Sequence, residues 1–176
     1  MSNKELMIEL KDTEWDFDYI DHDRQIVRAI VFDDNKYFYF VRVHRNDEFG
    51  KVTLIETSGG GVEDYEHLEV AIKRELKEEL GANVDIVCKI GIVSDYYNII
   101  HRHNINNYYL CKVKSFGDKN MTQDEIENFR LSTLKLTYED VIKEYEKCSN
   151  SKLGRLIKNR ELPILKRAKE KIDALG

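Results

Sequence analysis

A run of three glycines, Gly59 to Gly61, joins an apolar segment to a helical pattern, and this junction limits the possible folds more than any other feature. The preceding segment, VTLIET at residues 52–57, has the β-branched composition of a buried strand. After the glycines, apolar residues recur at helical spacing over residues 66–80, and Gly81 stands where a left-handed cap is expected. A strand that leads through glycines into a helix is typical of α/β proteins.

Further strands are predicted where apolar or alternating runs occur, at residues 24–32, 37–45, 85–97, 107–116 and 131–136. The turn sequence DDNK separates the first two runs, which predicts a hairpin. Two helices are indicated toward the C-terminus. One begins at the capping sequence that starts with Thr137, and the other lies within residues 151–176, where Pro163 predicts a kink or a restart. We therefore expect the α/β class, with a mixed sheet and helices on both faces.

Length and composition indicate one soluble globular domain. A chain of 176 residues can bury a substantial core, and a net charge of −5 gives no general reason to expect nucleic acid or a membrane as partner. The first residues lack the apolar region of a signal peptide, and no segment has the length of a membrane span. The three cysteines are far apart and form no CxxC motif, which indicates reduced thiols and a cytoplasmic protein.

The helix after the glycines carries an acidic face. Glu75, Glu78 and Glu79 are spaced i, i+3 and i+4, so their side chains share one side of the helix. Like charges this close repel one another, which leaves two interpretations: a cation bound between the carboxylates, or a solvated helix surface. Mg²⁺ takes oxygen ligands, and carboxylates on adjacent turns can supply two or three of them.

The spacing of these residues resembles the Nudix box, GX5EX7REUXEEXGU, in which U is an aliphatic residue. All seven fixed positions match, at Gly60, Glu66, Arg74, Glu75, Glu78, Glu79 and Gly81. Leu76 fits the first aliphatic position, whereas Ala82 is smaller than the residue usual at the last. The resemblance covers about residues 25–145 and implies an α/β/α sandwich. We expect one domain over residues 1–176, with residues 1–24 as an N-terminal extension and 151–176 as a C-terminal helical segment.

The resemblance also implies an activity, the metal-dependent hydrolysis of a diphosphate linkage in a nucleoside diphosphate joined to another group X. Mg²⁺ is the implied cofactor, with Mn²⁺ as a substitute, and the substrate is a small nucleotide, including dinucleoside polyphosphates and nucleoside triphosphates. Glu78 and Glu79 are the implied metal ligands, and Glu75 is a ligand or the base that activates water. The Gly59 carbonyl is a further implied ligand. Arg74 is expected to pair with box carboxylates and so to hold the loop against the helix.

An acidic segment after the box, residues 121–129, precedes a short predicted strand. Many members of the family take one more acidic ligand from a loop in this place, and Glu125 and Glu127 are the candidates for an additional metal ligand or base. The alternative is that both are surface charges of a loop.

Substrate recognition has fewer signals. Arg28, Arg42 and Arg45 lie on or near the first strands and could contact phosphates, although surface positions would explain them equally well. Tyr97 could stack on a base, or could simply pack in the core. Ser58 stands where the family usually has a proline two residues before the box glycine, which could loosen the turn.

Functions other than hydrolysis fit this sequence less well. The C-terminal segment has eight Lys or Arg against three acidic residues, which fits a solvated helix better than a surface for RNA or a second subunit. Homodimers are frequent in the family, so a homodimer is a further expectation. A diphosphate isomerase of the same fold usually departs from the box at positions intact here. A nucleotide-sensing binding module usually loses box carboxylates, which this chain retains.

Overall fold

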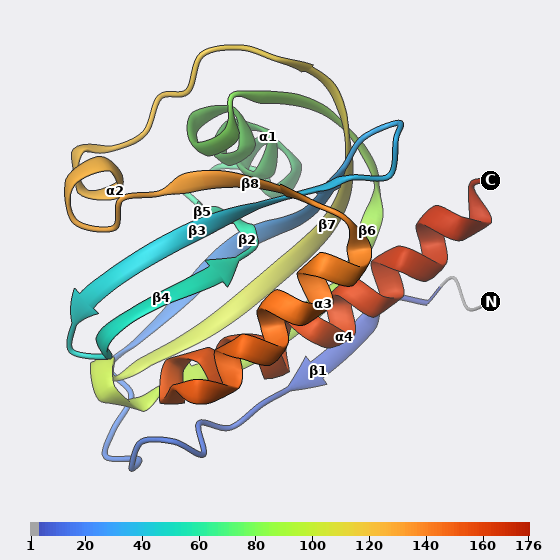
Figure 1. Cartoon of the computed structure of the whole chain (residues 1–176). Coiled ribbons are helices and arrows are strands. Elements are labelled where there is room, and N and C mark those ends of the chain that lie inside the picture. Colours follow the sequence, from blue (N-terminus) through green and yellow to red (C-terminus); the bar gives the residue numbers. More distant parts are fainter. Residues whose placement is uncertain (1–3) are drawn as a thin grey trace.

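The computed structural model describes residues 4–176, which form a mixed β-sheet with helices on both sides (Figure 1). Within these residues the strands are β1 (Leu6–Glu9), β2 (His22–Phe32), β3 (Phe38–Asp47), β4 (Gly50–Glu56), β5 (Ser58–Gly61), β6 (Ala82–Tyr97), β7 (Arg102–Phe116) and β8 (Ser132–Leu136). The helices are α1 (Leu68–Leu80), α2 (Gln123–Glu127), α3 (Tyr138–Lys147) and α4 (Lys152–Ala174), with short 3-10 turns at Asn98–Ile100 and Cys148–Asn150.

The sheet divides beside β2, and this division positions the candidate site. The strand order is β1-β6-β7-β2-β3-β4, with β5 paired to β2 and β8 paired to β3. β2 runs parallel to β7 along its whole length but pairs with β3 only at Val31↔Tyr39 and Phe32↔Phe38. Beyond that point the edge of β2 pairs with β5, while β3 pairs with β4 and β8.

Helix α1 covers one face of the sheet because its apolar residues recur on one side. Ile72, Leu76 and Leu80 are buried against residues of β2 and β7 in a shared apolar cluster. Gly81 ends the helix in the left-handed conformation, at φ 68°, and its N–H donates to the carbonyl of Lys77 at 3.0 Å. The predicted helix and its glycine cap are confirmed, with the helix starting two residues later than expected.

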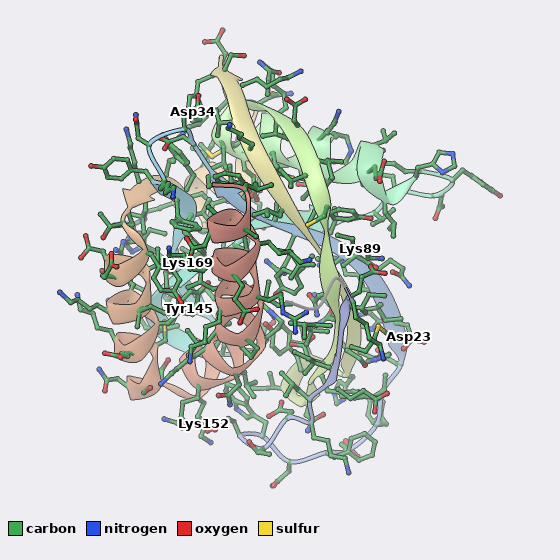
Figure 2. The ribbon with its side chains drawn as sticks, turned by 90° about the vertical axis from the view of Figure 1, so that its right-hand side faces the viewer. Asp23, Asp34, Lys89, Tyr145, Lys152 and Lys169 are labelled. Carbon is green, nitrogen blue, oxygen red and sulfur yellow. The ribbon has the colours of Figure 1, made fainter. Side chains whose placement is uncertain are left out.

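Helices α3 and α4 cover the opposite face, as Figure 2 shows with Tyr145 on the helical side of the strands. The apolar stripe of α4, which includes Ile157, Ile164 and Leu165, is buried in the larger of the two clusters. The helix continues without interruption through Pro163, so the alternative of a restart there was wrong. Buried contacts on both sides of the proline offset the hydrogen bond that it cannot donate.

The α/β class, the hairpin and all six predicted strands are confirmed, with ends shifted by a few residues. Two strands had no recognisable pattern. β1 lies in the expected N-terminal extension and pairs in parallel with β6, and β5 consists of the serine and three glycines expected to form a turn. None of the helices described in residues 4–176 is long and apolar enough to span a membrane.

Candidate functional site

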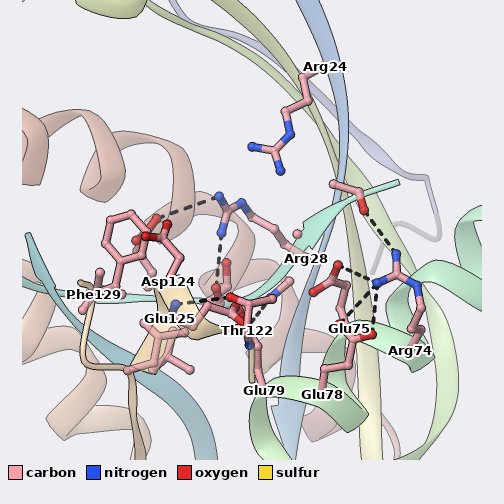
Figure 3. A pocket seen from close by; sticks show the side chains of 18 of the residues that line it. Arg24, Arg28, Arg74, Glu75, Glu78, Glu79, Thr122, Asp124, Glu125 and Phe129 are labelled. Atoms are coloured by element: carbon pink, nitrogen blue, oxygen red, sulfur yellow. Dashed lines mark hydrogen bonds and ion pairs between the residues drawn. The ribbon is translucent and has the colours of Figure 1, made fainter. Parts of the chain in front are cut away.

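A cavity of about 700 Å³ lies beside the division of the sheet, where α1, β2, β3, β5 and α2 meet (Figure 3). Its lining is mostly charged. The acidic residues are Glu56, Glu63, Glu75, Glu78, Glu79, Asp124 and Glu125, and the basic residues are Arg24, Arg28, Arg45, Arg74 and Arg102. The cavity therefore brings together Gly59, which directly precedes the box, and the box residues Arg74, Glu75, Glu78 and Glu79. One of the two later acidic candidates and Arg28 line it as well.

Glu79 is the most buried carboxylate of the α1 group, with 7% of the residue exposed. Its Oε1 accepts hydrogen bonds from the Ser58 hydroxyl at 2.6 Å and from the Gly59 N–H at 3.2 Å. Burial raises the pKa of Glu79 well above its ordinary value, and a hydrogen bond shared with Glu125 acts in the same direction. Ser58, unexpected at this position, thus binds Glu79 directly through a hydroxyl that proline does not have.

Glu75 fits against β5 because Gly60 has no side chain. A Cβ placed on Gly60 would lie 2.6 Å from the Glu75 carboxylate, and one on Gly59 would lie 2.0 Å from the carbonyl oxygen of Val27. Burial raises the pKa of Glu75, and Glu78 and Glu125 add to this while Arg74 opposes it. A buried carboxyl with a raised pKa is suited to accept a proton near neutral pH.

Arg74 joins the loop after β5 to helix α1. Its Nε and Nη2 donate to the two carboxylate oxygens of Glu66 at 2.7 and 2.8 Å, and Nη2 also donates to the Gly61 carbonyl at 3.2 Å. Its Nη1 donates to Glu75 at 2.9 Å and to Glu78 at 3.3 Å. This fork geometry lowers the pKa of Glu66 to about 2, chiefly through the side-chain hydrogen bond with Arg74. Arg74 thus pairs with three carboxylates of the box, those of Glu66, Glu75 and Glu78.

The two later acidic candidates are placed differently. Glu125, on α2, lines the cavity and contacts Glu79, and its own carboxylate also closes a capping box with Thr122. The Glu127 carboxylate, two residues on, accepts a hydrogen bond from Gln123 and is not among the residues that line the cavity.

A group of charged residues forms the cavity wall farther from α1. Arg28 donates to the Thr57 carbonyl at 3.2 Å and lies 3.8 Å from Glu56, which also lies 3.7 Å from Arg45. Arg45 stands 5.1 Å over the ring of Phe129. Glu56 was not among the predicted residues, because an acidic residue at the end of an apolar strand gave no signal of a role.

The C-terminal helix α4 contacts the same region from the opposite face of the sheet. Arg160, fully buried on α4, donates to the Tyr97 hydroxyl at 2.6 Å and forms ion pairs with Asp95 at 3.2 Å and Glu56 at 3.4 Å. Its neighbour Glu161 accepts from the N–H and the hydroxyl of Thr57 at 2.7 and 2.8 Å. We refer to Arg160, Glu161 and their partners as the α4 network. Because Thr57 directly precedes Ser58 and Gly59, this network holds the backbone that contacts Glu79.

Two predicted substrate residues lie elsewhere. The Arg42 guanidinium pairs with Glu144 of α3 at 3.3 Å and lines a separate cavity between β3, β4 and α3. The Tyr97 ring packs in the core under α3 and α4, and its hydroxyl belongs to the α4 network. Arg24 and Arg102, which do line the main cavity, were not predicted, because their approach depends on the pairing of β2 with β7.

The donor atoms of the α1 group suit a hard divalent cation, since carboxylates and a backbone carbonyl are the oxygen ligands that Mg²⁺ prefers. Across residues 4–176, no three His, Cys, Asp or Glu side chains are already gathered around one point. Arg74 draws Glu75 and Glu78 toward itself, while Ser58 and Gly59 hold Glu79. The residues fit a metal in their chemistry, and side-chain rotation would be needed for them to share one.

Comparison with known proteins gives a consistent result. The family model described as the NUDIX domain matches residues 22–150, which is well over half of the chain. No curated protein sequence matches the chain.

Solved structures with the same fold include a NUDIX hydrolase from Nitrosomonas europaea, with a TM-score of 0.62 and 15% identity over 87% of this chain and 90% of that one. An ADP compounds hydrolase has a TM-score of 0.63 and 16% identity over 87% and 75% of the two chains. A MutT NUDIX hydrolase from Burkholderia pseudomallei has a TM-score of 0.52 and 20% identity over 68% and 86%. At these identities the likeness is one of fold.

Proposed function

The chain belongs to the Nudix family of hydrolases that act on pyrophosphate-containing substrates, and we propose that it hydrolyses a diphosphate linkage in a nucleoside diphosphate joined to a further group. The observation that carries this proposal is the convergence of Glu75, Glu78, Glu79 and the Gly59 loop on one cavity that also contains arginines. Carboxylates suit a divalent cation, and guanidinium groups suit phosphate oxygens.

Glu78, Glu79 and the Gly59 carbonyl are the proposed ligands of Mg²⁺ or Mn²⁺, and of the two roles open to Glu75, ligand or base, we propose the base. Glu125 is a stronger candidate than Glu127 for the additional acidic ligand, because it lines the cavity beside Glu79. When bound, such a cation neutralises charge that develops on phosphate oxygens and lowers the pKa of a bound water.

The protein's own groups have separate proposed roles. Glu75 receives the proton of the attacking water, for which its raised pKa is suited. Arg74 fixes the Gly61 carbonyl and Glu66, and thereby holds β5 against α1. Arg28, which is tied to Thr57 on the cavity wall, is placed to contact substrate phosphate.

The test is a panel of nucleoside triphosphates, dinucleoside polyphosphates and nucleoside diphosphate sugars, incubated with Mg²⁺ in ¹⁸O-labelled water. We expect two phosphorylated products from at least one compound, with one ¹⁸O atom in one of them, and a loss of at least about 100-fold in the Glu78→Gln variant. A single isomeric product with the diphosphate linkage intact and no ¹⁸O would favour an isomerase, and nucleotide binding without product would favour a sensing module. Equal turnover by wild type and variant would refute the role given to Glu78.

A further inference from the structure

Three arginines line the part of the cavity next to β2 and β7. Arg24 and Arg28 are four residues apart on β2, so their side chains leave the strand on the same side. Arg102 begins β7, the parallel neighbour of β2, where it pairs with His22. All three line the same cavity as the α1 carboxylates, and Figure 3 shows the Arg24 guanidinium directed toward Arg28.

The side chains of these three arginines differ in the hydrogen bonds and ion pairs that they form. Arg28 is tied to Thr57 and Asn106 and lies near Glu56. Arg102 donates a hydrogen bond from Nε to Nε2 of His22 at 3.0 Å, and an imidazole cannot neutralise the charge of a guanidinium group. The Arg24 side chain has neither a hydrogen bond nor an ion pair with any residue between 4 and 176, and no dashed line reaches it in Figure 3.

The Arg24 side chain lies against the glycines of β5. A Cβ placed on Gly61 would lie 2.7 Å from its Nη2 atom, so the guanidinium packs directly over that glycine. The adjacent Gly60 is equally close to the Glu75 carboxylate. The unpaired Arg24 guanidinium and the Glu75 carboxylate therefore lie against neighbouring glycines of β5.

Such a grouping of like charges has an electrostatic cost. Desolvation lowers the pKa of Arg24, and repulsion from Arg102 and Arg28 lowers it further, with Glu75 opposing. The other arginines of the cavity differ, because Arg74 is neutralised by Glu66 and Arg45 by Glu56 and Asp47. An anion between Arg24 and Arg102 would relieve the repulsion.

We propose that Arg24 and Arg102, with Arg28 at their base, bind a phosphate group of the substrate that lies beyond the cleaved diphosphate linkage. Guanidinium groups bind phosphate through paired N–H donors, which makes this the ligand chemistry that best fits the three arginines. The preferred substrate then carries at least one phosphate more than the cleaved linkage requires, whereas a neutral sugar in that position leaves the arginines unpaired. This inference rests on the proposed function, because it assigns a substrate class to the same cavity.

The additional phosphate could belong to a linear polyphosphate chain or could be attached to a sugar. Two matched pairs of substrates separate these sources: diadenosine tetraphosphate against diadenosine diphosphate, and NADP⁺ against NAD⁺. We expect kcat/KM for the more phosphorylated member of at least one pair to exceed that of its partner by about tenfold or more. Arg24→Gln should lower kcat/KM for the more phosphorylated member far more than for its partner, and so remove most of this preference.

Arg167→Gln is the matched control, because Arg167 lies on α4 outside the cavity and pairs with Glu170. The proposal is overturned if wild type shows no preference in either pair, or if Arg24→Gln lowers both members of a pair equally.

Binding of inorganic tripolyphosphate and pyrophosphate, measured by calorimetry, tests the arginines without turnover. We expect tripolyphosphate to bind about tenfold more tightly than pyrophosphate, with the difference lost in Arg24→Gln. If this selectivity holds while no nucleotide is hydrolysed, the proposed function fails and the phosphate site stands. If nucleotides are hydrolysed without the selectivity, the phosphate site fails and the proposed function stands.

Discussion

Glu75 and Glu79 of α1 and the carboxylates beneath α4 are all buried, yet their charges are balanced in different ways. Glu56, which belongs to the α4 network, lies within 4 Å of three guanidinium groups, at 3.8, 3.7 and 3.4 Å from Arg28, Arg45 and Arg160. Burial alone would raise the pKa of Glu56, but Arg45, Arg28 and Arg160 together bring it below the ordinary value.

On α1 the balance is reversed. Arg74 is divided among Glu66, Glu75 and Glu78, and Glu79 has no cationic partner within residues 4–176. The pKa values of Glu75 and Glu79 are raised as a result of burial that arginine does not offset. Carboxylates that arginines already neutralise serve to hold the fold, whereas those without enough internal cations are suited to bind a cation from solution.

The largest effect is expected for Glu79→Gln. Loss of a proposed metal ligand should lower kcat by about 10³-fold, or about 4 kcal/mol, once a substrate is known. The free energy of unfolding in EDTA at neutral pH should stay the same or rise, because an unbalanced buried carboxylate is removed. Steady-state kinetics and urea unfolding measure the two quantities.

Glu69→Gln is the control for that variant, because Glu69 is exposed on the same helix and does not line the cavity. A fall in stability without a loss of kcat in Glu79→Gln would place Glu79 with the structural carboxylates.

The next effect in size concerns the α4 network. Arg160→Met should lower the free energy of unfolding by about 3–5 kcal/mol, since it leaves buried Glu56 and Asp95 with fewer cations. Arg155, on the same helix, pairs with Glu14 at 2.6 Å and its side chain is 40% exposed. Arg155→Met should therefore lower the free energy of unfolding much less than Arg160→Met does. Urea unfolding of both variants decides, and equal losses would contradict the distinction between the two groups.

A smaller change in the free energy of unfolding is expected for Glu66→Gln, because Arg74 neutralises Glu66 within the site. Its pKa is lowered to about 2, so its contribution to stability is present above its ordinary pKa of 4.5 and is lost as the pH falls toward 2. Glu66→Gln should cost about 2 kcal/mol at pH 6 to 7 and almost nothing near pH 2. Unfolding free energies of wild type and variant across this range provide the measurement, and a pH-independent difference would show that the ion pair is not its source.

Sequence reasoning found what local patterns encode. The acidic face of α1 and its end at Gly81 follow from residue spacing within one helix, and the pairing of Arg74 with Glu66 follows from the box. Strands β1 and β5 were not predicted. β1 has four residues of mixed character and becomes a strand through pairing with β6, and the glycines of β5 do so through pairing with β2.

The long-range contacts in the site could not be predicted from the sequence either. Glu161 lies in a helix whose basic composition indicated a solvated surface, and its burial against Thr57 depends on how α4 crosses the sheet. Arg24 lies in a strand-like segment, and its approach to Gly61 arises from the pairing of β2 with β5. A pattern within one element cannot report contacts that depend on which elements become neighbours.

Binding of Mn²⁺ to α1 can be measured directly by titration, with the electron paramagnetic resonance signal of the free ion as the readout. We predict saturable binding to the wild-type protein and to Glu69→Gln, and affinity weaker by about 100-fold in the double variant Glu78→Gln/Glu79→Gln. Equal Mn²⁺ binding by the wild type and the double variant, or no binding by any of them, would contradict a cation site on this helix.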